Sequence, residues 1–436
     1  MAPKPLELWG GIECTVNRVG AEYYDQLHFS GHVRRLCDLT ALNSLGLRAL
    51  RYPVLWEHAA RGEQELDLTW ADERLARLKE LDLTPIAGLL HHGSGPSHTS
   101  LLDPRFPEKL AHYAGVVGKR YPWLTHFTPV NEPLTTARFS SLYGHWYPHE
   151  RSDRAFVRAL LNQVWGTVLA LRALRRENPH ARLVQTEDLG FIRSTPDLAY
   201  QARFENERRF LGLDLLFGRV DQHHALYGYL RRFGASEAEL ALFCESPTPP
   251  DVLGFNYYVT GERFLDSRID AYPAHVVGRN GRQRYADVEA VRVCRRGLLG
   301  PAPLLLEAYA RYRTPLVITE AHLAGPAEEQ ARWFSYIWHA AESARSAGAD
   351  VRAVTAWALL GSYGWDKLVT QGACSYEAGA FQVVNDELIE TPYAGFLRAV
   401  GRGAPPVAAG GWWQGRERLL YEEDDAALRQ AREAND

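Results

Sequence analysis

Residues 126–133 read His-Phe-Thr-Pro-Val-Asn-Glu-Pro, an apolar, β-prone run that turns abruptly polar. The run to Val130 predicts a strand, and Pro133 ends it because proline has no amide hydrogen for the ladder. Residues 315–322 are built alike, Pro-Leu-Val-Ile-Thr-Glu-Ala-His. Glu132 and Glu320 therefore each follow a buried strand, and they could meet across one cleft if both strands belong to one barrel. Two carboxyl groups flanking one bond are the usual equipment of glycoside hydrolysis.

Strand-like and helix-like segments alternate about eight times along the chain. We expect strands at residues 6–16, 47–56, 84–91, 126–130, 182–185, 251–260, 316–320 and 351–360. We expect helices at residues 31–45, 70–81, 107–121, 156–178, 303–312, 326–347 and 393–400, with a mainly helical region at 200–244. This alternation predicts an α/β fold, a single (β/α)₈ barrel with enlarged βα loops. The alternative is a doubly wound open sheet, but no Gly-x-Gly-x-x-Gly follows the first strand.

Two segments lie outside this pattern. Residues 262–298 read as a long irregular insertion rich in Arg and Gly, and such loops are more often functional than idle. We place the barrel domain at residues 1–400. Residues 401–436 read as a linker-like segment, a Trp412-Trp413 pair more typical of packing than of a sugar platform, and a charged tail. That tail either packs back loosely or is the remnant of a link to another domain.

Charge and hydropathy exclude two classes of partner. A formal net charge of -4 leaves no basic footprint for nucleic acid. No apolar run approaches the roughly 20 residues of a membrane span, and residues 1–5 lack the apolar core of a signal peptide. The expected partner is a small molecule, and the sequence leaves open whether the chain forms oligomers.

The cysteines and histidines do not form a recognisable metal or redox motif. The five cysteines are scattered and odd in number: Cys14, Cys37, Cys244, Cys294 and Cys374. We interpret them as reduced thiols of a cytoplasmic protein. Histidines gather at residues 91–98 and 145–149, but without the fixed spacing of a metal site. We therefore expect no metal and no cofactor.

Seven short motifs follow one another between residues 6 and 400. They are Leu8-Trp9-Gly10-Gly11, Arg51-Tyr52-Pro53-Val54-Leu55-Trp56, Leu89-Leu90-His91-His92, Thr128-Pro129-Val130-Asn131-Glu132-Pro133, Leu253-Gly254-Phe255-Asn256-Tyr257-Tyr258, Ile318-Thr319-Glu320, and Trp357-Ala358-Leu359-Leu360 with Trp365 after it. In this order they resemble the motifs of glycoside hydrolase family 1, the β-glucosidase-type (β/α)₈ enzymes. The resemblance is that of a diverged member, and it implies a retaining β-glycosidase without a cofactor.

The resemblance also implies roles for individual residues. Glu320 would be the nucleophile and Glu132 the acid/base, with Arg51 and Tyr258 beside Glu320 to keep its pKa low and the group ionised. Glu132 would need a raised pKa. Asn131 would bond the sugar 2-hydroxyl, and His91 and Trp357 would shape the pocket for the glycone, the sugar that is transferred. The other candidate substrate-binding residues are Glu13, Asn17, Glu187, Asn256 and Trp365.

Three positions depart from the family pattern. Asn17 stands where the family has Gln, Ala321-His322 where it has Asn-Gly, and Gly364 where it has a sugar-binding Glu. These departures leave room for a substituted, deoxy or otherwise unusual glycone, with Glu13, Glu187 and Asp188 as substitute hydrogen-bond acceptors. Two alternatives stay open: a transglycosidase acting on a glycosylated metabolite, and a non-catalytic sugar-binding barrel that has lost activity.

Overall fold

A computed structural model describes residues 5–63, 65–372, 375–407 and 410–421. Eight parallel strands close into a barrel in the order β1-β14-β13-β9-β7-β6-β5-β4. They are β1 (Glu7–Gly11), β4 (Ala49–Pro53), β5 (Thr84–Gly88), β6 (His126–Thr128), β7 (Arg182–Asp188), β9 (Val252–Tyr257), β13 (Leu316–Ala321) and β14 (Val351–Ala356). The predicted (β/α)₈ barrel is confirmed, and the open-sheet alternative is wrong.

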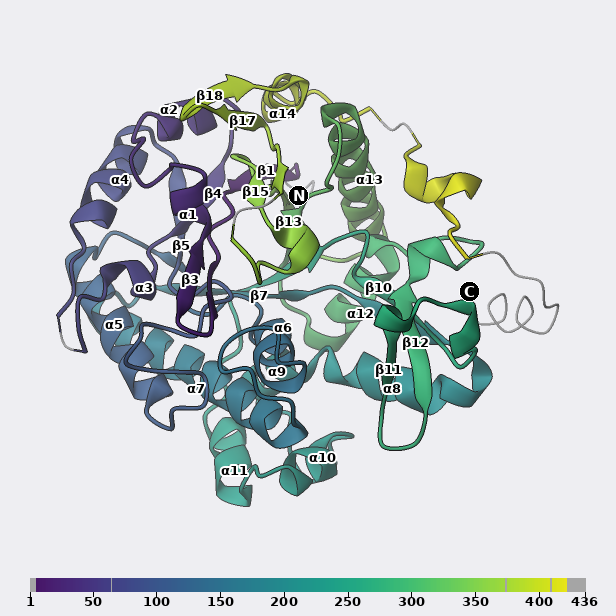
Figure 1. Cartoon of the computed structure of the whole chain (residues 1–436). Helices are drawn as coiled ribbons and strands as arrows, with labels where there is room; N and C mark the ends of the chain where they lie inside the picture. Colours follow the sequence, from purple (N-terminus) through teal and green to yellow (C-terminus); the bar gives the residue numbers. More distant parts are fainter. Residues whose placement is uncertain (1–4, 64, 373–374, 408–409, 422–436) are drawn as a thin grey trace.

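Helices surround the barrel, as Figure 1 shows. They are α1 (Gln26–Phe29), α2 (Asp38–Asn43), α3 (Trp56–Ala59), α4 (Thr69–Glu80), α5 (Phe106–Arg120), α6 (Pro133–Ala137), α7 (Asp153–Glu177), α8 (Ala199–Arg208), α9 (Leu211–Leu216), α10 (Tyr227–Arg232), α11 (Glu237–Glu245), α12 (Pro301–Tyr312), α13 (Ala327–Ser346) and α14 (Pro392–Gly401). The longest, α7, begins at Ser152, whose side chain accepts a hydrogen bond from the Ala155 amide.

The barrel strands are apolar on both faces because both faces are buried. Seven strands each contribute one side chain to a layer inside the barrel: Trp9, Ala49, Ile86, Val184, Val252, Val317 and Ala353. Their neighbours along each strand, such as Leu50, Leu253 and Ile318, belong to the larger core that includes the helices. This double burial explains why continuous apolar runs predicted the strands.

The insertion at residues 262–298 is not irregular, so that prediction is wrong. It contains β10 (Glu262–Asp266), β11 (Val277–Arg279) and β12 (Arg284–Glu289), which join β8 (Phe191–Ser194) in a four-stranded sheet. Phe264, Ala286 and Val288 are buried in the small core of this sheet. The outward-facing residues are charged, and β8 comes from another loop, so the strand pattern was hidden in the sequence.

Several predicted boundaries differ from the observed ones. The first strand ends at Gly11, and the chain then forms a hairpin of β2 (Val16–Val19) and β3 (Glu22–Asp25). Residues 31–45 are helical only in α2, because Gly31 starts the segment with a left-handed turn at φ +72°. Strand β6 ends at Thr128, and Pro133 is the first residue of α6 rather than the end of a strand.

The C-terminal part described by the structure lies against the barrel domain. Two short hairpins, β15 (Ser362–Tyr363) with β16 (Tyr376–Glu377) and β17 (Phe381–Val384) with β18 (Glu387–Glu390), precede α14. Trp413 is buried with its ring 4.9 Å from that of Trp333, which agrees with the expected packing role. Most of the predicted tail, residues 422–436, lies outside the described residues, as do Cys374 and residues 1–4. No helix in the described part of the chain combines the length and apolar character needed to cross a bilayer.

Asp214 on α9 is fully buried and carries a network that ties α9 to α12. Its carboxylate accepts hydrogen bonds from Arg311 (2.5 and 3.0 Å) and Tyr312 (2.9 Å), and it contacts His224. We expect Asp214→Ala to lower the free energy of unfolding by roughly 3 kcal/mol, because a buried ion pair loses one partner. Urea denaturation measures this. Glu207→Ala is the matched control, since Glu207 meets Arg311 at 3.7 Å but is exposed, and it should cost less than about 1 kcal/mol. Equal losses in both variants would contradict the prediction.

Candidate active site

Glu132 sits between β6 and α6 in a strained backbone conformation. Its φ and ψ of 43° and 62° are left-handed, a region that a Glu residue seldom adopts and that often marks functional sites. The preceding Asn131 is held by bridges to His91 and Thr186, and Pro133 starts α6. This geometry turns the Glu132 side chain inward, where its Oε1 accepts a hydrogen bond from Asn256 Nδ2 at 2.6 Å. His92 Nε2 lies 3.7 Å from the other carboxylate oxygen.

Glu320 is near the end of β13 and is almost completely buried. Its Oε1 accepts from Arg51 Nη1 at 2.7 Å, and its Oε2 accepts from the Tyr258 hydroxyl at 2.5 Å. Arg51 comes from β4, three strands from β13 around the closed barrel, and Tyr258 directly follows β9. Both partners that the family resemblance placed beside Glu320 are therefore in contact with it.

A single network of polar side chains joins the two carboxylates. Arg51 Nη2 donates to Asn131 Oδ1 at 2.7 Å while its Nη1 holds Glu320. Asn256, which donates to Glu132, accepts in turn from Thr319 Oγ1 at 2.7 Å, one residue before Glu320. Thr186 Oγ1 also donates to Asn131 Oδ1 at 2.8 Å. The two glutamates are thus held by partners that are themselves held, which restricts the rotation of both side chains.

Burial raises the pKa of both glutamates, but their neighbours act on the two pKa values in opposite directions. Burial raises the pKa of Glu132 well above its ordinary value, and the charge of Glu320 raises it further. Burial also raises the pKa of Glu320, to about 7, against the lowering effect of Arg51 and Tyr258. The expectation that these two partners keep the Glu320 pKa low is wrong, because desolvation outweighs them. The expected contrast in surroundings is present: Arg51 and Tyr258 stabilise the charged form of Glu320, whereas the charge of Glu320 disfavours the charged form of Glu132.

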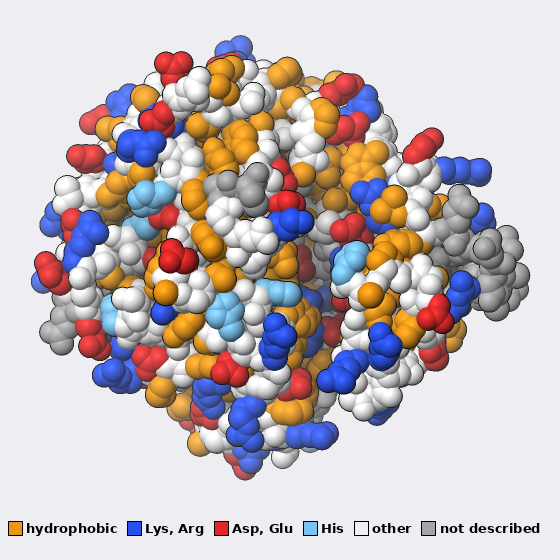
Figure 2. Space-filling view, viewed as in Figure 1, with side chains coloured by type: hydrophobic (Ala, Val, Ile, Leu, Met, Phe, Trp, Pro, Cys, Tyr) orange, Lys and Arg blue, Asp and Glu red, His pale blue; other side chains and the backbone are white. Residues whose placement is uncertain are grey.

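Aromatic rings and neutral histidines line the same part of the barrel mouth. The Trp357 ring stacks on His91 with centroids 5.3 Å apart, and the Arg51 guanidinium lies 4.5 Å from the Trp357 ring. Trp357 Nε1 donates to Glu13 at 3.2 Å. Burial lowers the pKa of His91 well below its ordinary value and that of His92 to about 3, so both rings are neutral near pH 7. Figure 2 shows the surface hollowed beside the barrel mouth, with acidic side chains along the hollow.

The loop after β15 accepts hydrogen bonds from two side-chain donors that lie near this region. Asn17 Nδ2 donates to the Val369 carbonyl and Trp146 Nε1 to the Leu368 carbonyl, each at 2.7 Å. Leu368 and Val369 both have left-handed backbone, with φ of 52° and 51°. Asn17 therefore binds the protein's own backbone here rather than presenting a free amide. Trp365, from the same loop, lies with its ring 5.8 Å from that of His92.

Glu187 faces away from the pair, although its charge also contributes to the raised pKa of Glu132. Strand β7 alternates its side chains, and the Glu187 carboxylate faces α9, where a Cβ on Gly212 would lie 2.3 Å from its Oε1. The next residue, Asp188, faces the mouth instead, and its charge contributes to the raised pKa of Glu132. Burial raises the pKa of Asp188 itself to about 6. Thr186 and Thr319 were missed by sequence reasoning, although each lies close in sequence to a polar candidate at a strand end.

The candidate residues thus fall into three groups. Glu132, Glu320, Arg51, Asn131, His91, Asn256 and Tyr258 share contacts around the pair. Trp357, Glu13 and Trp365 adjoin this group through ring contacts and a hydrogen bond, whereas Asn17 is bound by the loop and Glu187 faces outward. Among the described residues, one set of three side chains has metal-ligand spacing, Asp25, His28 and His58, and it contains none of these candidates.

Comparisons with known proteins support the fold from structure rather than from sequence. No family model matches the chain, and no curated protein sequence matches it. Solved structures of a family 1 β-glucosidase from Thermotoga maritima are similar, with a TM-score of 0.74, 16% identity, and coverage of 93% of this chain and 100% of that one. The same enzyme in complex with deoxynojirimycin gives a TM-score of 0.74 at 15% identity, and in complex with cyclophellitol 0.73 at 17%. At such low identity the likeness extends to the fold.

Proposed function

We propose that the protein is a retaining β-glycosidase that hydrolyses a small or unusual β-glycoside through a glycosyl-enzyme intermediate. The observation that carries the proposal is the pair of buried glutamates, Glu132 and Glu320, held in one network but in opposite electrostatic surroundings. Double displacement requires two neighbouring carboxyl groups in different states. One keeps its proton, and the other is ionised and bound by a cation. The sugar-like ligands of the Thermotoga maritima β-glucosidase support the same barrel mouth as the substrate site.

In the first step Glu320 attacks the anomeric carbon while Glu132 donates its proton to the leaving oxygen. The C–O bond to the leaving group breaks as the bond to Glu320 Oε forms, and the leaving group departs as a neutral alcohol. Arg51 and Tyr258 orient the attacking carboxylate. Asn131, fixed by Arg51 and Thr186, is positioned to bond the 2-hydroxyl, a contact that strengthens in the transition state.

In the second step water attacks the glycosyl-enzyme and Glu132 accepts the proton of that water. Glu320 becomes neutral in the ester, so the charge that raised the Glu132 pKa is gone and Glu132 can act as a base. Glu320 leaves as a carboxylate and returns to Arg51 and Tyr258. The net configuration at the anomeric carbon is retained because it is inverted twice.

The contacts of the loop that carries Leu368 and Val369 favour a substrate whose glycone is neither plain glucose nor galactose. Its backbone carbonyl oxygens already accept hydrogen bonds from Asn17 Nδ2 and Trp146 Nε1. Gly364 has φ +69°, so a glutamate side chain at this position would strain the backbone. By resemblance, the positions of Asn17 and Gly364 would bind a common hexose. Here Gly364 has no side chain, and Asn17 is bound to the loop.

The pH dependence of kcat/KM tests the electrostatic order of the pair. Below pH 7 Glu320 is increasingly protonated and cannot attack, so the acid limb should lie near pH 7. The alkaline limb should lie higher, where Glu132 loses its proton. Tyr258→Phe removes a hydrogen bond that lowers the Glu320 pKa and should move the acid limb to higher pH. A profile with its optimum near pH 5, unchanged by Tyr258→Phe, would contradict this order.

The decisive experiment is mass spectrometry of the intact protein after incubation with 2-deoxy-2-fluoro glycosyl traps. Gluco, galacto, manno and fuco forms would be offered, since the glycone is unknown. We expect one trap to add a single glycosyl group, which peptide mapping places on Glu320. An adduct on another residue would refute the assignment of the nucleophile. Full turnover of a glycoside with inverted configuration would refute the retaining mechanism, and sugar binding without adduct or turnover would favour the non-catalytic barrel.

A further inference from the structure

A cavity outside the glutamate pair lies where three βα loops meet. It has a volume of about 480 Å³ and is bounded by the β2–β3 hairpin, α1, α3 and residues 96–98. Its polar lining includes Tyr23, Asp25, His28, Glu57, His58, Arg61, Ser97 and His98. Neither Glu132 nor Glu320 takes part in it. The loops after β1, β4 and β5 therefore enclose a second polar space at the side of the barrel.

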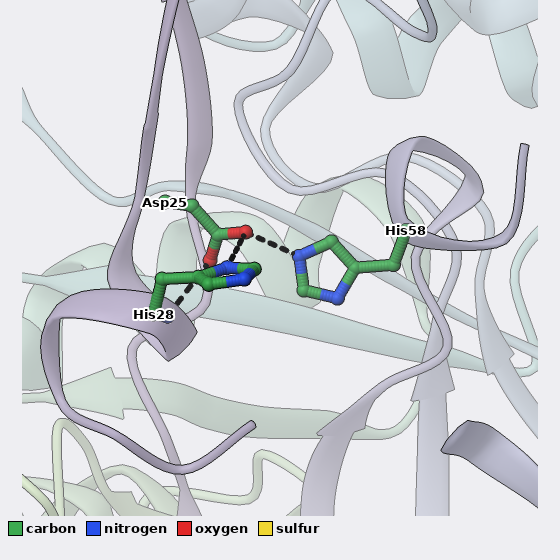
Figure 3. Close-up of side chains that lie close together, drawn as sticks. All are labelled: Asp25, His28 and His58. Atoms are coloured by element: carbon green, nitrogen blue, oxygen red, sulfur yellow. Dashed lines mark hydrogen bonds and ion pairs between the residues drawn. The ribbon is translucent and has the colours of Figure 1, made fainter. Parts of the chain in front are cut away.

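Asp25, His28 and His58 converge on one point at the edge of this cavity, as Figure 3 shows. Asp25 Oδ2 lies 2.7 Å from His28 Nδ1 and 2.5 Å from His58 Nε2. One atom from each side chain lies within 4.8 Å of the other two. The side chains of Asp25 and His58 are mostly buried, whereas that of His28 is 63% exposed, so solvent can reach the group from the His28 side.

The local fold holds these three side chains in place. Asp25 is the N-cap of α1, and its Oδ1 accepts from the amides of Leu27 and His28. This fixes the carboxylate and leaves Oδ2 for the two imidazoles. His58 is on α3, directly after Glu57. The group is therefore preorganised by two elements that are distant in sequence.

Two further polar atoms on residues that line the cavity have no partner in the described part of the chain. Glu57 Oε2 and His98 Nε2 are shielded from solvent and have no hydrogen-bond partner there. The other Glu57 oxygen accepts from the Gly95 amide at 3.1 Å, so this carboxylate is held in place with one oxygen to spare. Buried polar atoms left unpaired are costly, and each such group calls for an explanation. Both residues line the same cavity as Asp25, His28 and His58, so this side of the barrel carries several polar groups close together.

We propose that Asp25, His28 and His58 bind a divalent transition metal ion of the zinc class, with its remaining coordination position open to the cavity. Two imidazoles and a carboxylate suit such ions, and three protein ligands with one open position is a common zinc arrangement. The ion would replace the hydrogen bonds that now join the histidines to Asp25. With bonds of about 2.0–2.1 Å the ligand atoms need to stand about 3.3 Å apart, so the distance from Asp25 Oδ2 to each imidazole nitrogen increases by less than about 1 Å.

This site differs from what the sequence predicted. The histidine clusters at residues 91–98 and 145–149 carried no metal motif, and no metal was expected. Asp25 and His28 are three residues apart on one turn, but His58 joins them only through the fold, so no spacing in the sequence reveals the group. The proposed metal site is independent of the proposed glycosidase function, since no residue is common to both.

Zinc titration of the full-length, untagged chain after removal of metals by a chelator tests this proposal. Calorimetry and elemental analysis of the dialysed protein should give one ion per chain. We expect His28→Gln and His58→Gln each to weaken binding by at least about 10- to 100-fold, the loss seen even when a group that only orients a metal ligand is removed. Asp25→Asn should do the same while keeping the N-cap oxygen of α1. Cobalt should give visible absorption bands in the wild type that these variants lose.

His339→Gln is the matched control, because His339 also contacts a carboxylate three residues away, Glu342 at 3.1 Å, on an exposed helix face. It should bind zinc as the wild type does. The exposed His28 tolerates substitution without risk to the core, so His28→Gln keeps the test valid if another variant folds poorly. Wild-type binding that is absent, or that persists unchanged in His28→Gln and His58→Gln, would overturn the proposal.

Discussion

Replacing Glu320 by glycine is expected to lower kcat/KM for an activated aryl β-glycoside by about 10⁴- to 10⁶-fold, the order of loss when a covalent nucleophile is removed. The sugar would be the one that the fluoro-glycoside traps identify. The loss should be large because no other carboxylate can take over: Glu132 is bound by Asn256, and Arg51 and Tyr258 are directed at Glu320. Glycine also leaves a space beside the anomeric carbon where a small anion can enter.

Azide is the reagent that separates loss of the nucleophile from loss of the fold. Azide in that space should restore turnover and yield the α-glycosyl azide, because a single displacement on a β-glycoside inverts the configuration. Glu187→Gln is the matched control, since Glu187 is a buried glutamate at the end of a barrel strand whose carboxylate faces α9. It should keep activity within about tenfold, whereas Glu320→Gln should not. Wild-type activity in Glu320→Gly, or no rescue by azide with a folded protein, would contradict the assigned role.

Much of the barrel could be predicted because each strand carries its own signal. Runs such as 316–320 are apolar on both faces and end in a polar residue, so burial and the strand exit are both visible in the local sequence. The inserted sheet could not be predicted, because β8 and β10 pair across 70 residues and because buried charged residues, Arg193, Glu262 and Asp266, interrupt their apolar pattern. Local patterns do not record pairings of this kind.

The candidate site was predictable to the extent that its residues lie at strand ends. Arg51, Tyr258 and Asn131 meet the glutamates as expected. The direction of a side chain was harder to predict, since a strand alternates its faces: Glu187 points outward and Asp188 inward. The partner of Asn17 depends on a loop more than 350 residues away, which no local pattern contains.

The raised pKa of Glu320 shows how a buried pair divides one charge. Sequence reasoning considered only the partners of Glu320, a cation and a hydroxyl, which both stabilise the ionised form. Burial acts on both glutamates, so it raises both pKa values and leaves the difference to the partners. A site of this kind holds one negative charge near neutral pH, and Arg51 determines that it resides on Glu320.

Replacing Glu132 by alanine should give a loss that depends on the leaving group. With an alkyl glycoside, whose leaving oxygen needs a proton, kcat/KM should fall by about 10²- to 10⁴-fold. With a dinitrophenyl glycoside the first step needs no acid, so kcat/KM should change little. The second step still lacks its base, so the glycosyl-enzyme should accumulate, visible as a burst of phenolate and an adduct on Glu320.

Added azide should shorten the life of that adduct and give the β-glycosyl azide, the opposite anomer from the product of Glu320→Gly. Azide attacks without needing a base, and the site that Glu132 vacates lies on the face from which water normally arrives. The two variants are therefore distinguished by the configuration of one product, measured by NMR on the isolated azide. An equal loss with good and poor leaving groups would remove Glu132 from the acid/base role, because the loss of a proton donor should slow a basic leaving group far more than an acidic one.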